Sequence, residues 1–394
     1  MNISLDIYLT MSIAAIFLFV GMALKGKIEV LRTFCIPAPV AGGILFALLS
    51  LFLNVTKIAE ITLDTSLQTI FMNAFFTTVG FTADFKMIKR GGILVGKFIA
   101  IVTLLVFLQD VLGVILSYAF GIEPLLGLCI GSISMTGGHG NAASFGPMIE
   151  EMGVIGASAV SLSAATFGLV AGSIIGGPIA RRLIERHKVA LPDKEGSTED
   201  MALEKTDITS KSLISAAAQI FIVMGIGSII SERISALGIT LPSFIGALVT
   251  AVLARNICDI LGINLSLEAI EAHGEVCLNL FLSLALISLK LWELLELALP
   301  MLAILAAQTL LMAVFAYFIT FYAMGKNYTA CCIAAGLCGF GMGATPNAMA
   351  NMEAVTLRYG ECRQAFIVVA VVGGLFVNFA NSAILTIFIN ILGK

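Results

Sequence analysis

Charge and histidine are scarce in this chain of 394 residues. Only 12% of the residues are charged and 59% are hydrophobic, whereas about 25% of the residues of a soluble domain are charged. Three histidines and no H-E-x-x-H pattern argue against a metalloenzyme. The eight cysteines form no C-x-x-C pair, so we expect small buried hydrophobic residues rather than metal ligands or disulfides. This composition indicates a polytopic membrane protein, with the lipid bilayer and not nucleic acid as its partner.

Ten apolar segments approach the length of about 20 residues that a membrane-spanning helix needs. They lie at about 5–23, 37–53, 67–83, 92–118 and 155–180 in the first half, and at about 212–231, 241–256, 272–291, 298–322 and 364–391 in the second. A charged stretch separates the halves. We therefore expect an all-α protein with an N-terminal membrane repeat over 1–185, a linker over 186–211 and a C-terminal repeat over 212–394.

The two halves share an order of features at an offset of about 205 residues. Matching pairs include Pro37 and Pro242, Asn73 and Asn279, Gln109 and Gln308, and Gly138 and Gly343. Five spans in each half mean that the second half enters from the opposite side, which predicts inverted repeats. Lysine and arginine gather on the face that carries the linker, so we expect a cytoplasmic linker and both termini outside.

Two glycine-rich interruptions of apolar helices lie half a chain apart, at 136–143 (TGGHGNAA) and 339–348 (GFGMGATPNA). Glycine tolerates irregular backbone, and proline removes an amide donor. Within hydrocarbon, irregular backbone persists only inside protein or beside a water-filled cavity. Such breaks at matching positions of two halves are typical of the binding site of a secondary transporter. We expect each to form the tip of a re-entrant hairpin, over about 124–150 and 327–353.

Helix N-termini at these tips would offer free N–H groups and partial positive charge to a carboxylate, without a dedicated arginine. The candidates for substrate contact are Gly137, Gly138, His139, Gly140 and Asn141 on the first tip and Gly343, Ala344, Thr345, Pro346 and Asn347 on the second. His139 could contact the substrate, relay a proton or fix the tip. The alternative for the glycines is close helix packing.

Unwound carbonyls and polar oxygens at membrane depth suit Na⁺ as a coupling ion. The candidate ligands are Asn73, Thr77, Ser134, Thr136, Asn279, Ser283, Thr345 and Asn381, although each could instead join helices by hydrogen bonds. Asp110 is a carboxylate inside the fourth span, which marks it as a functional candidate. The alternative is that it lies near the outer end of this long span, in contact with water.

The chain resembles the bacterial glutamate:sodium symporter (ESS) family. The stretches that carry the resemblance are 36–43 (IPAPVAGG), 134–140 (SMTGGHG), 165–170 (ATFGLV), 175–178 (IGGP), 289–294 (LKLWEL), 298–305 (ALPMLAIL), 325–328 (GKNY) and 338–346 (CGFGMGATP). The resemblance covers nearly the whole chain apart from the linker. It implies Na⁺-coupled uptake of L-glutamate by an inner-membrane homodimer in which a transport domain slides past a scaffold. The chain departs from the family at Asn378, where members can carry an acidic residue.

We therefore expect a symporter that works by alternating access, needs no cofactor besides the coupling ion and is not an enzyme. An intramembrane hydrolase would need a nucleophile with a base, and the chain has no G-x-S-x-G motif. Two alternatives within transport stay open: another carboxylate as substrate, and coupling to H⁺ through His139. A passive channel is the third alternative, because glycine-lined tips can also line a pore.

Overall fold

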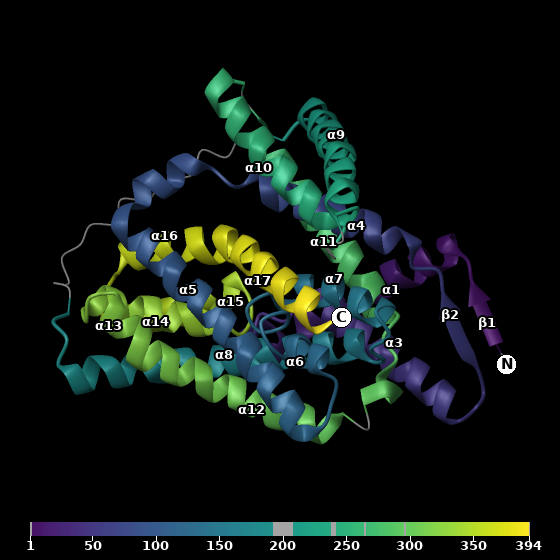
Figure 1. The fold of residues 1–394 in the computed structure, drawn as a ribbon, viewed down its shortest axis with the longest axis horizontal. Helices are drawn as coiled ribbons and strands as arrows, with labels where there is room; N and C mark the ends of the chain where they lie inside the picture. The colour runs from purple at the N-terminus through teal and green to yellow at the C-terminus, as the bar shows by residue number, and fades with distance from the viewer. Residues whose placement is uncertain (1, 192–207, 238–241, 264, 295–296, 394) are drawn as a thin grey trace.

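The computed structural model describes residues 2–191, 208–237, 242–263, 265–294 and 297–393, and its ribbon is drawn in Figure 1. In these ranges nine helical segments are long and apolar enough to cross a membrane. Seven of them are α1 (Ile7–Lys27), α3 (Ala38–Val55), α5 (Phe85–Phe120) from Gly92 onward, α8 (Ala157–His187), α9 (Ser210–Ser235), α10 (Phe244–Leu261) and α11 (Leu267–Ile287). The third predicted span is α4 (Ser66–Phe81), which is apolar but has only 16 residues. All ten predicted spans are therefore helices.

The two remaining spans each continue through a π-helical turn. α12 (Ala298–Val314) leads through η2 (Phe315–Thr320) into α13 (Phe321–Ala323), and α16 (Arg363–Val371) leads through η3 (Val372–Phe376) into α17 (Val377–Leu392). Such turns are rare and are frequently found at functional sites. The second turn carries Gly373 and Gly374, which line a cavity described below.

The helices form two bundles, and each half of the chain contributes to both. The first bundle consists of α1, α3 and α4 from the first half and α9, α10 and α11 from the second. The second bundle consists of the remaining long helices together with four shorter ones, which are α6 (Pro124–Ile130), α7 (Gly138–Glu151), α14 (Tyr328–Phe340) and α15 (Thr345–Tyr359). In Figure 1, α9 and α10 project from the molecule on the side away from α12. Corresponding spans of the two halves thus lie in the same bundle.

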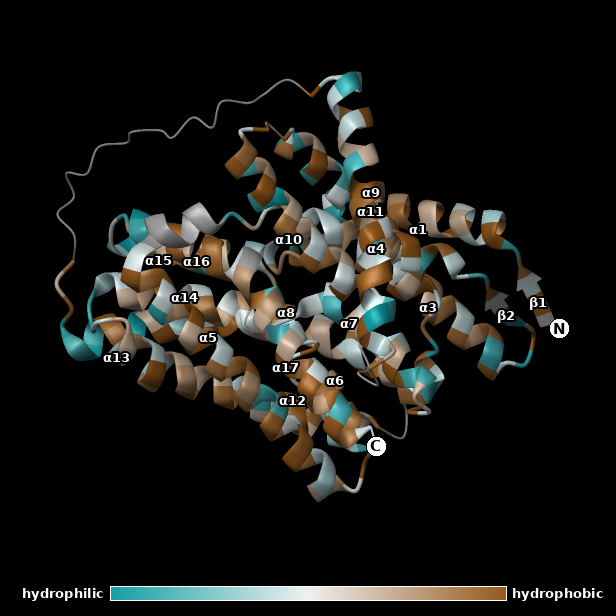
Figure 2. Ribbon diagram, turned by 45° about the horizontal axis from the view of Figure 1, so that its top comes forward, coloured by the Kyte–Doolittle hydropathy of each residue, from teal (hydrophilic) through white to brown (hydrophobic). Residues whose placement is uncertain are grey.

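The long helices consist largely of apolar residues, which Figure 2 shows as brown stretches of their ribbons, and many of these residues are exposed. Large exposed side chains of this kind include Phe19, Phe52, Ile260 and Leu310. Such a surface is stable in the lipid bilayer, because exposing this much apolar area to water is unfavourable. The main hydrophobic core lies in the second bundle and around its contact with α3, α4 and α11.

A small sheet departs from the all-α expectation. Strands β1 (Asn2–Leu5) and β2 (Glu60–Leu63) pair in parallel, with Asn2 opposite Glu60. Both alternate polar residues with isoleucine and leucine, the pattern of a half-exposed strand. Four residues are too few for this alternation to stand out between two long apolar segments, which is why the sequence did not predict it.

The predicted linker over 186–211 falls mostly outside the described residues, since 192–207 are not described. Helix α8 runs to His187, beyond the predicted end at 180, and an ion pair between Arg181 and Glu185 supports this last part. Two further short helical elements are α2 (Glu29–Thr33) before α3 and η1 (Leu291–Leu294) after α11.

Candidate functional site

The first break separates α6 from α7. The helix α6 ends at Ile130, and residues 131–137 form turns before α7 begins at Gly138. Gly138 has φ +59°, a left-handed conformation that glycine adopts without a steric penalty. The irregular backbone therefore lies on the N-terminal side of the predicted stretch 136–143, and the residues after Gly138 are helical.

The second break separates α14 from α15 at residues 341–344. The chain reverses here, because α14 and α15 pack on each other and the Asn351 amide nitrogen donates to the Ala335 carbonyl at 3.2 Å. Pro346 occupies the first turn of α15, where the missing N–H removes no helical hydrogen bond. The two arms form a helical hairpin with a four-residue tip.

The two breaks touch each other. A Cβ atom built on Gly138 would lie 2.8 Å from the Gly343 carbonyl oxygen. Gln109 of α5 joins them further, since its Nε2 donates to the Gly341 carbonyl at 2.8 Å and its Oε1 accepts from the Thr136 hydroxyl at 2.6 Å. The Gln308 side chain of α12 in turn donates to the Gln109 carbonyl at 2.7 Å. Gln109 was not among the predicted site residues, although the repeated internal glutamine was a signal for it.

A cavity of about 350 Å³ lies where the breaks meet, and we call it the break cavity. It is lined by 136–141 of the first break, 343–346 of the second, Phe75, Phe76 and Val79 of α4, Leu278 and Leu282 of α11, and Gly373, Gly374, Val377 and Asn378 around η3. Nine of the ten predicted substrate-contact residues thus border one space. Apolar walls with a few polar groups are typical of a small-molecule site.

Two helices begin at the break cavity. The first residues of α7, Gly138 to Asn141, line it, and so do Ala344, Thr345 and Pro346 at the start of α15. The N–H groups of a first helical turn have no partner within the helix, and the helix dipole adds partial positive charge there. Among the described residues that line this cavity, none carries a charge. The helix ends are therefore its main source of positive potential.

Asn141 is the polar side chain that most clearly lacks a partner. It is 1% exposed and lines the break cavity, yet neither its Nδ2 nor its Oδ1 has a hydrogen-bond partner. A buried amide without partners costs about 1–3 kcal/mol per group. An amide in this position can bind a polar ligand.

His139 is tied to α8. Its Nε2 lies 3.0 Å from the Thr166 hydroxyl oxygen, and that hydroxyl donates to the Leu162 carbonyl at 2.9 Å. Since the threonine proton is used, the histidine nitrogen is the donor of the first bond. This arrangement favours a role in fixing the first break, while the ring still lines the break cavity.

Asn347 is the predicted contact residue that does not line the break cavity. Its Nδ2 lies 3.0 Å from the Phe34 carbonyl, 3.3 Å from the Leu169 carbonyl and 2.6 Å from the Ser173 hydroxyl. It therefore connects the start of α15 to α8 and to the segment after α2.

The predicted Na⁺ ligands do not form one cluster. Thr136 and Thr345 line the break cavity. Thr77 and Ser283 are buried on α4 and α11, and Ser283 Oγ has no partner. Ser134 donates to backbone carbonyls, Asn381 contacts Ser132, and Asn279 is bonded to the Glu275 carbonyl of its own helix. Asn73 lines another cavity and accepts a hydrogen bond from Ser243 at 3.2 Å.

That other cavity, of about 710 Å³, is rich in serine and lies between α4, α7, α9 and the residues before α10. An aromatic layer of three rings lies between α4, α7 and α10, and its Phe76 lines the break cavity. Phe76 and Phe244 stack with ring centroids 3.8 Å apart, and Phe145 meets Phe244 edge-on at 5.8 Å. All three rings are buried. The layer joins α4 and α10 of the first bundle to α7 of the second.

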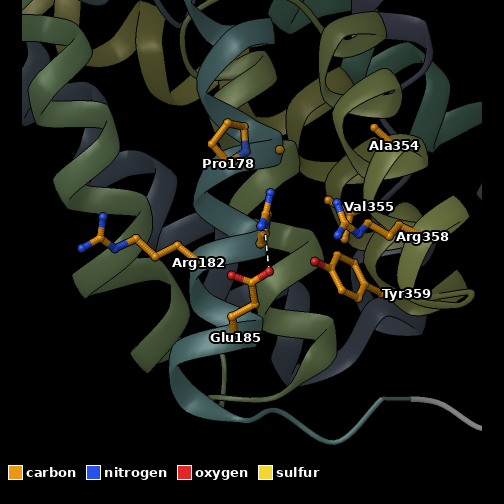
Figure 3. A pocket seen from close by; sticks show the side chains of 9 residues that line it. Pro178, Arg182, Glu185, Ala354, Val355, Arg358 and Tyr359 are labelled. Carbon is orange, nitrogen blue, oxygen red and sulfur yellow. Dashed lines mark hydrogen bonds and ion pairs between the residues drawn. The ribbon is translucent and has the colours of Figure 1, made fainter.

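A third cavity, of about 630 Å³, lies between the C-terminal parts of α8 and α15. It is lined by Arg181, Arg182, Glu185, Arg358 and Tyr359 among others, and Figure 3 shows Tyr359 on α15 facing Glu185 on α8. Arginine near a helix C-terminus is also favoured by the helix dipole. Neither break borders this arginine-lined cavity.

Residues 3–361 match the family model described as sodium/glutamate symporter. The chain is 41% identical to the sodium/glutamate symporter of Escherichia coli K12 over 391 residues, and 40% identical to that of Haemophilus influenzae over 395 residues, with 98% of each chain covered in both pairs. Among solved structures, the sodium proton antiporter MjNhaP1 of Methanocaldococcus jannaschii aligns over 99% of both chains with 13% identity and a TM-score of 0.43. This chain belongs to the sodium/glutamate symporter family, whose members are transporters and not enzymes.

Proposed function

We propose that this protein imports L-glutamate together with Na⁺, and that the break cavity holds the glutamate. One observation carries the assignment of the site: two breaks from different halves of the chain touch and enclose one cavity that receives two helix N-termini. The relatives at 40–41% identity are named sodium/glutamate symporters, which supports the ion and the substrate.

The N-termini of α7 and α15 supply what a carboxylate needs. The Gly138 N–H already donates to the Ser134 carbonyl and Pro346 has no N–H. The N–H groups of His139, Gly140 and Thr345 are the donors that these helix starts would offer, and the helix dipoles add attraction without a charged side chain. Asn141 offers both a donor and an acceptor, so its amide would bind a polar group of the amino acid. Thr345, at the start of α15, adds a hydroxyl group to the lining of the cavity.

Na⁺ would bind to oxygens beside the substrate. Of the predicted ligands, Thr136 and Thr345 have hydroxyl groups that line the break cavity, which supports them for this role. Glutamate carries one negative charge, and inward movement of net positive charge gains about 2.3 kcal/mol per charge for every 100 mV. At least two Na⁺ per glutamate are therefore needed for the membrane potential to help uptake.

The two bundles suggest how access alternates. The second bundle holds both breaks and would act as the transport domain, while the first would act as the scaffold in an elevator-type movement. We infer that the repeats are inverted, that both hairpins are re-entrant and that the protein is a homodimer in the inner membrane. The arginine-lined cavity would then face the cytoplasm, together with the linker, and both termini would lie outside.

Uptake into liposomes tests this proposal. The purified protein is reconstituted, and accumulation of L-[³H]glutamate is measured under an inward Na⁺ gradient, an inward proton gradient, or neither. We expect accumulation only with Na⁺, increased by an inside-negative potential. Accumulation with the proton gradient alone would move coupling to H⁺, and downhill flux without coupling would indicate a channel. Glutamate that is never accumulated, while another carboxylate is, would overturn the substrate.

A further inference from the structure

Asp110 is a carboxyl group that the proposed mechanism does not use. It lies on α5 with its side chain fully buried, facing Ser132 in the first break. An ionised carboxylate in such surroundings needs a cation or several donors, and otherwise it takes up a proton.

The helices around Asp110 bring no cation to it among their described residues. α6, α12, α16 and α17 pack against α5. α12 and α17 contain no titratable side chain, α6 has Cys129 and is preceded by Glu123, and α16 has Arg363 at its first position. Tyr317 lies in η2. On α5 itself the nearest cation in sequence is Lys97, 13 residues away, or about 20 Å along the helix.

The hydrogen bonds of Ser132 reveal the protonation state. Its backbone N–H donates to Asp110 Oδ1 at 2.9 Å. Its hydroxyl oxygen lies 2.9 Å from Asp110 Oδ2 and 2.6 Å from Asn381 Oδ1. The orientation of the Asn381 amide is fixed, because its Nδ2 donates to the Ser132 carbonyl at 3.1 Å. One hydroxyl proton thus faces two oxygens that both accept.

A proton on Asp110 resolves this conflict. Asp110 Oδ2 then donates to the Ser132 hydroxyl oxygen, and that hydroxyl donates to Asn381 Oδ1, so every polar atom of the three side chains has a partner. Without this proton, the Ser132 hydroxyl can donate to only one of its two neighbours, Asp110 Oδ2 or Asn381 Oδ1. The other pair of oxygens would then face each other without a hydrogen bond, which is unfavourable in a buried site. A metal ion fits the distances less well. Two oxygens that bind one ion at about 2.4 Å are about 3.4 Å apart at a right angle, which is wider than both observed pairs.

We propose a proton-binding site between the first break and the helices α5 and α17, formed by Asp110, Ser132 and Asn381. The bound proton links α5 and α17 to Ser132, four residues before Thr136. Its loss would break the hydrogen bond from the Ser132 hydroxyl to Asn381 Oδ1 and so loosen the first break, which borders the break cavity. This consequence for transport rests on the proposed function, whereas the proton site itself does not.

Infrared spectroscopy tests the site without any transported substrate. The protein in lipid is titrated, and the carbonyl-stretch band of protonated carboxyl groups is recorded in H₂O and D₂O. We expect a band at neutral pH that Asp110→Asn removes, that Ser132→Ala shifts because the acceptor is lost, and that Asp64→Asn leaves unchanged, since Asp64 is an exposed carboxyl group bonded to Ser66. A neutral-pH spectrum without this band, or with a band that persists in Asp110→Asn, would overturn the proposal.

The pH dependence of Na⁺-driven uptake gives a second readout. Uptake by the wild type should fall as rising pH removes the proton, whereas the amide of Asp110→Asn reproduces the donor and the acceptor of the protonated acid and should remove this fall. Asp110→Leu leaves the Ser132 N–H without an acceptor, and we expect its uptake to be about tenfold lower than that of Asp110→Asn. Equal pH profiles of wild type and Asp110→Asn would contradict the role in transport, even where the infrared band confirms the site.

Discussion

Gly138 is the residue at which a single methyl group should matter most. Its φ of +59° lies in the left-handed region, which costs an alanine about 1–2 kcal/mol. The added Cβ would also lie 2.8 Å from the Gly343 carbonyl oxygen, and relieving such a contact typically costs about 1–3 kcal/mol. The arrangement in which the two breaks touch would thus be destabilised by about 2–5 kcal/mol relative to the wild type. Since about 1.4 kcal/mol is a factor of ten, the initial rate of uptake by Gly138→Ala should fall at least about 30-fold.

The assay compares initial rates in proteoliposomes that contain equal amounts of folded protein. Gly225→Ala is the matched control, because Gly225 lies within the spanning helix α9 and a Cβ there would meet no atom within 4 Å. Its rate should equal that of the wild type. Gly138→Val, with a bulkier side chain, should abolish uptake. A rate for Gly138→Ala within twofold of the wild type would refute the reasoning that the two breaks must touch.

Three further variants probe the walls of the break cavity. Asn141→Leu keeps the volume but removes both polar atoms, so the KM for glutamate should rise about 10- to 100-fold, as for a lost hydrogen bond to a charged ligand; an unchanged KM would remove Asn141 from the site. Gln109→Leu removes the two side-chain hydrogen bonds that join Gln109 to Gly341 and to Thr136, and it should lower both the unfolding temperature and the rate of uptake. If neither falls, Gln109 does not bridge the breaks. Phe244→Ala opens the aromatic layer, and proteoliposomes preloaded with glutamate should leak it faster without Na⁺; a leak equal to that of the wild type would show that the layer is no barrier.

The positions of the breaks could be predicted because they depend on local chemistry. Glycine and proline change what the backbone itself tolerates, so the clusters near Gly138 and Pro346 marked where helices would be interrupted. The first break nevertheless lies a few residues earlier than predicted. Gly138 alone takes a left-handed conformation there, and the helix starts again directly after it.

The roles of buried polar residues could not be predicted, because they depend on contacts between distant segments. Asn347 is next to residues that line the break cavity, yet it points toward Ser173 of α8. From the sequence, Asp110 could equally have been exposed to water at the end of its helix. The structure shows that it is buried, because α6 and α17 pack on α5. The division of the spans into two bundles likewise follows from tertiary packing.

A structure of the protein with bound L-glutamate and Na⁺, determined by electron cryomicroscopy in lipid, would show directly which cavity binds the substrate. We expect density for one glutamate in the break cavity, with a carboxylate at the start of α7 or α15 and a polar group within hydrogen-bond distance of Asn141. Glutamate density in the serine-rich cavity beside Asn73 or in the arginine-lined cavity, with the break cavity empty, would contradict it.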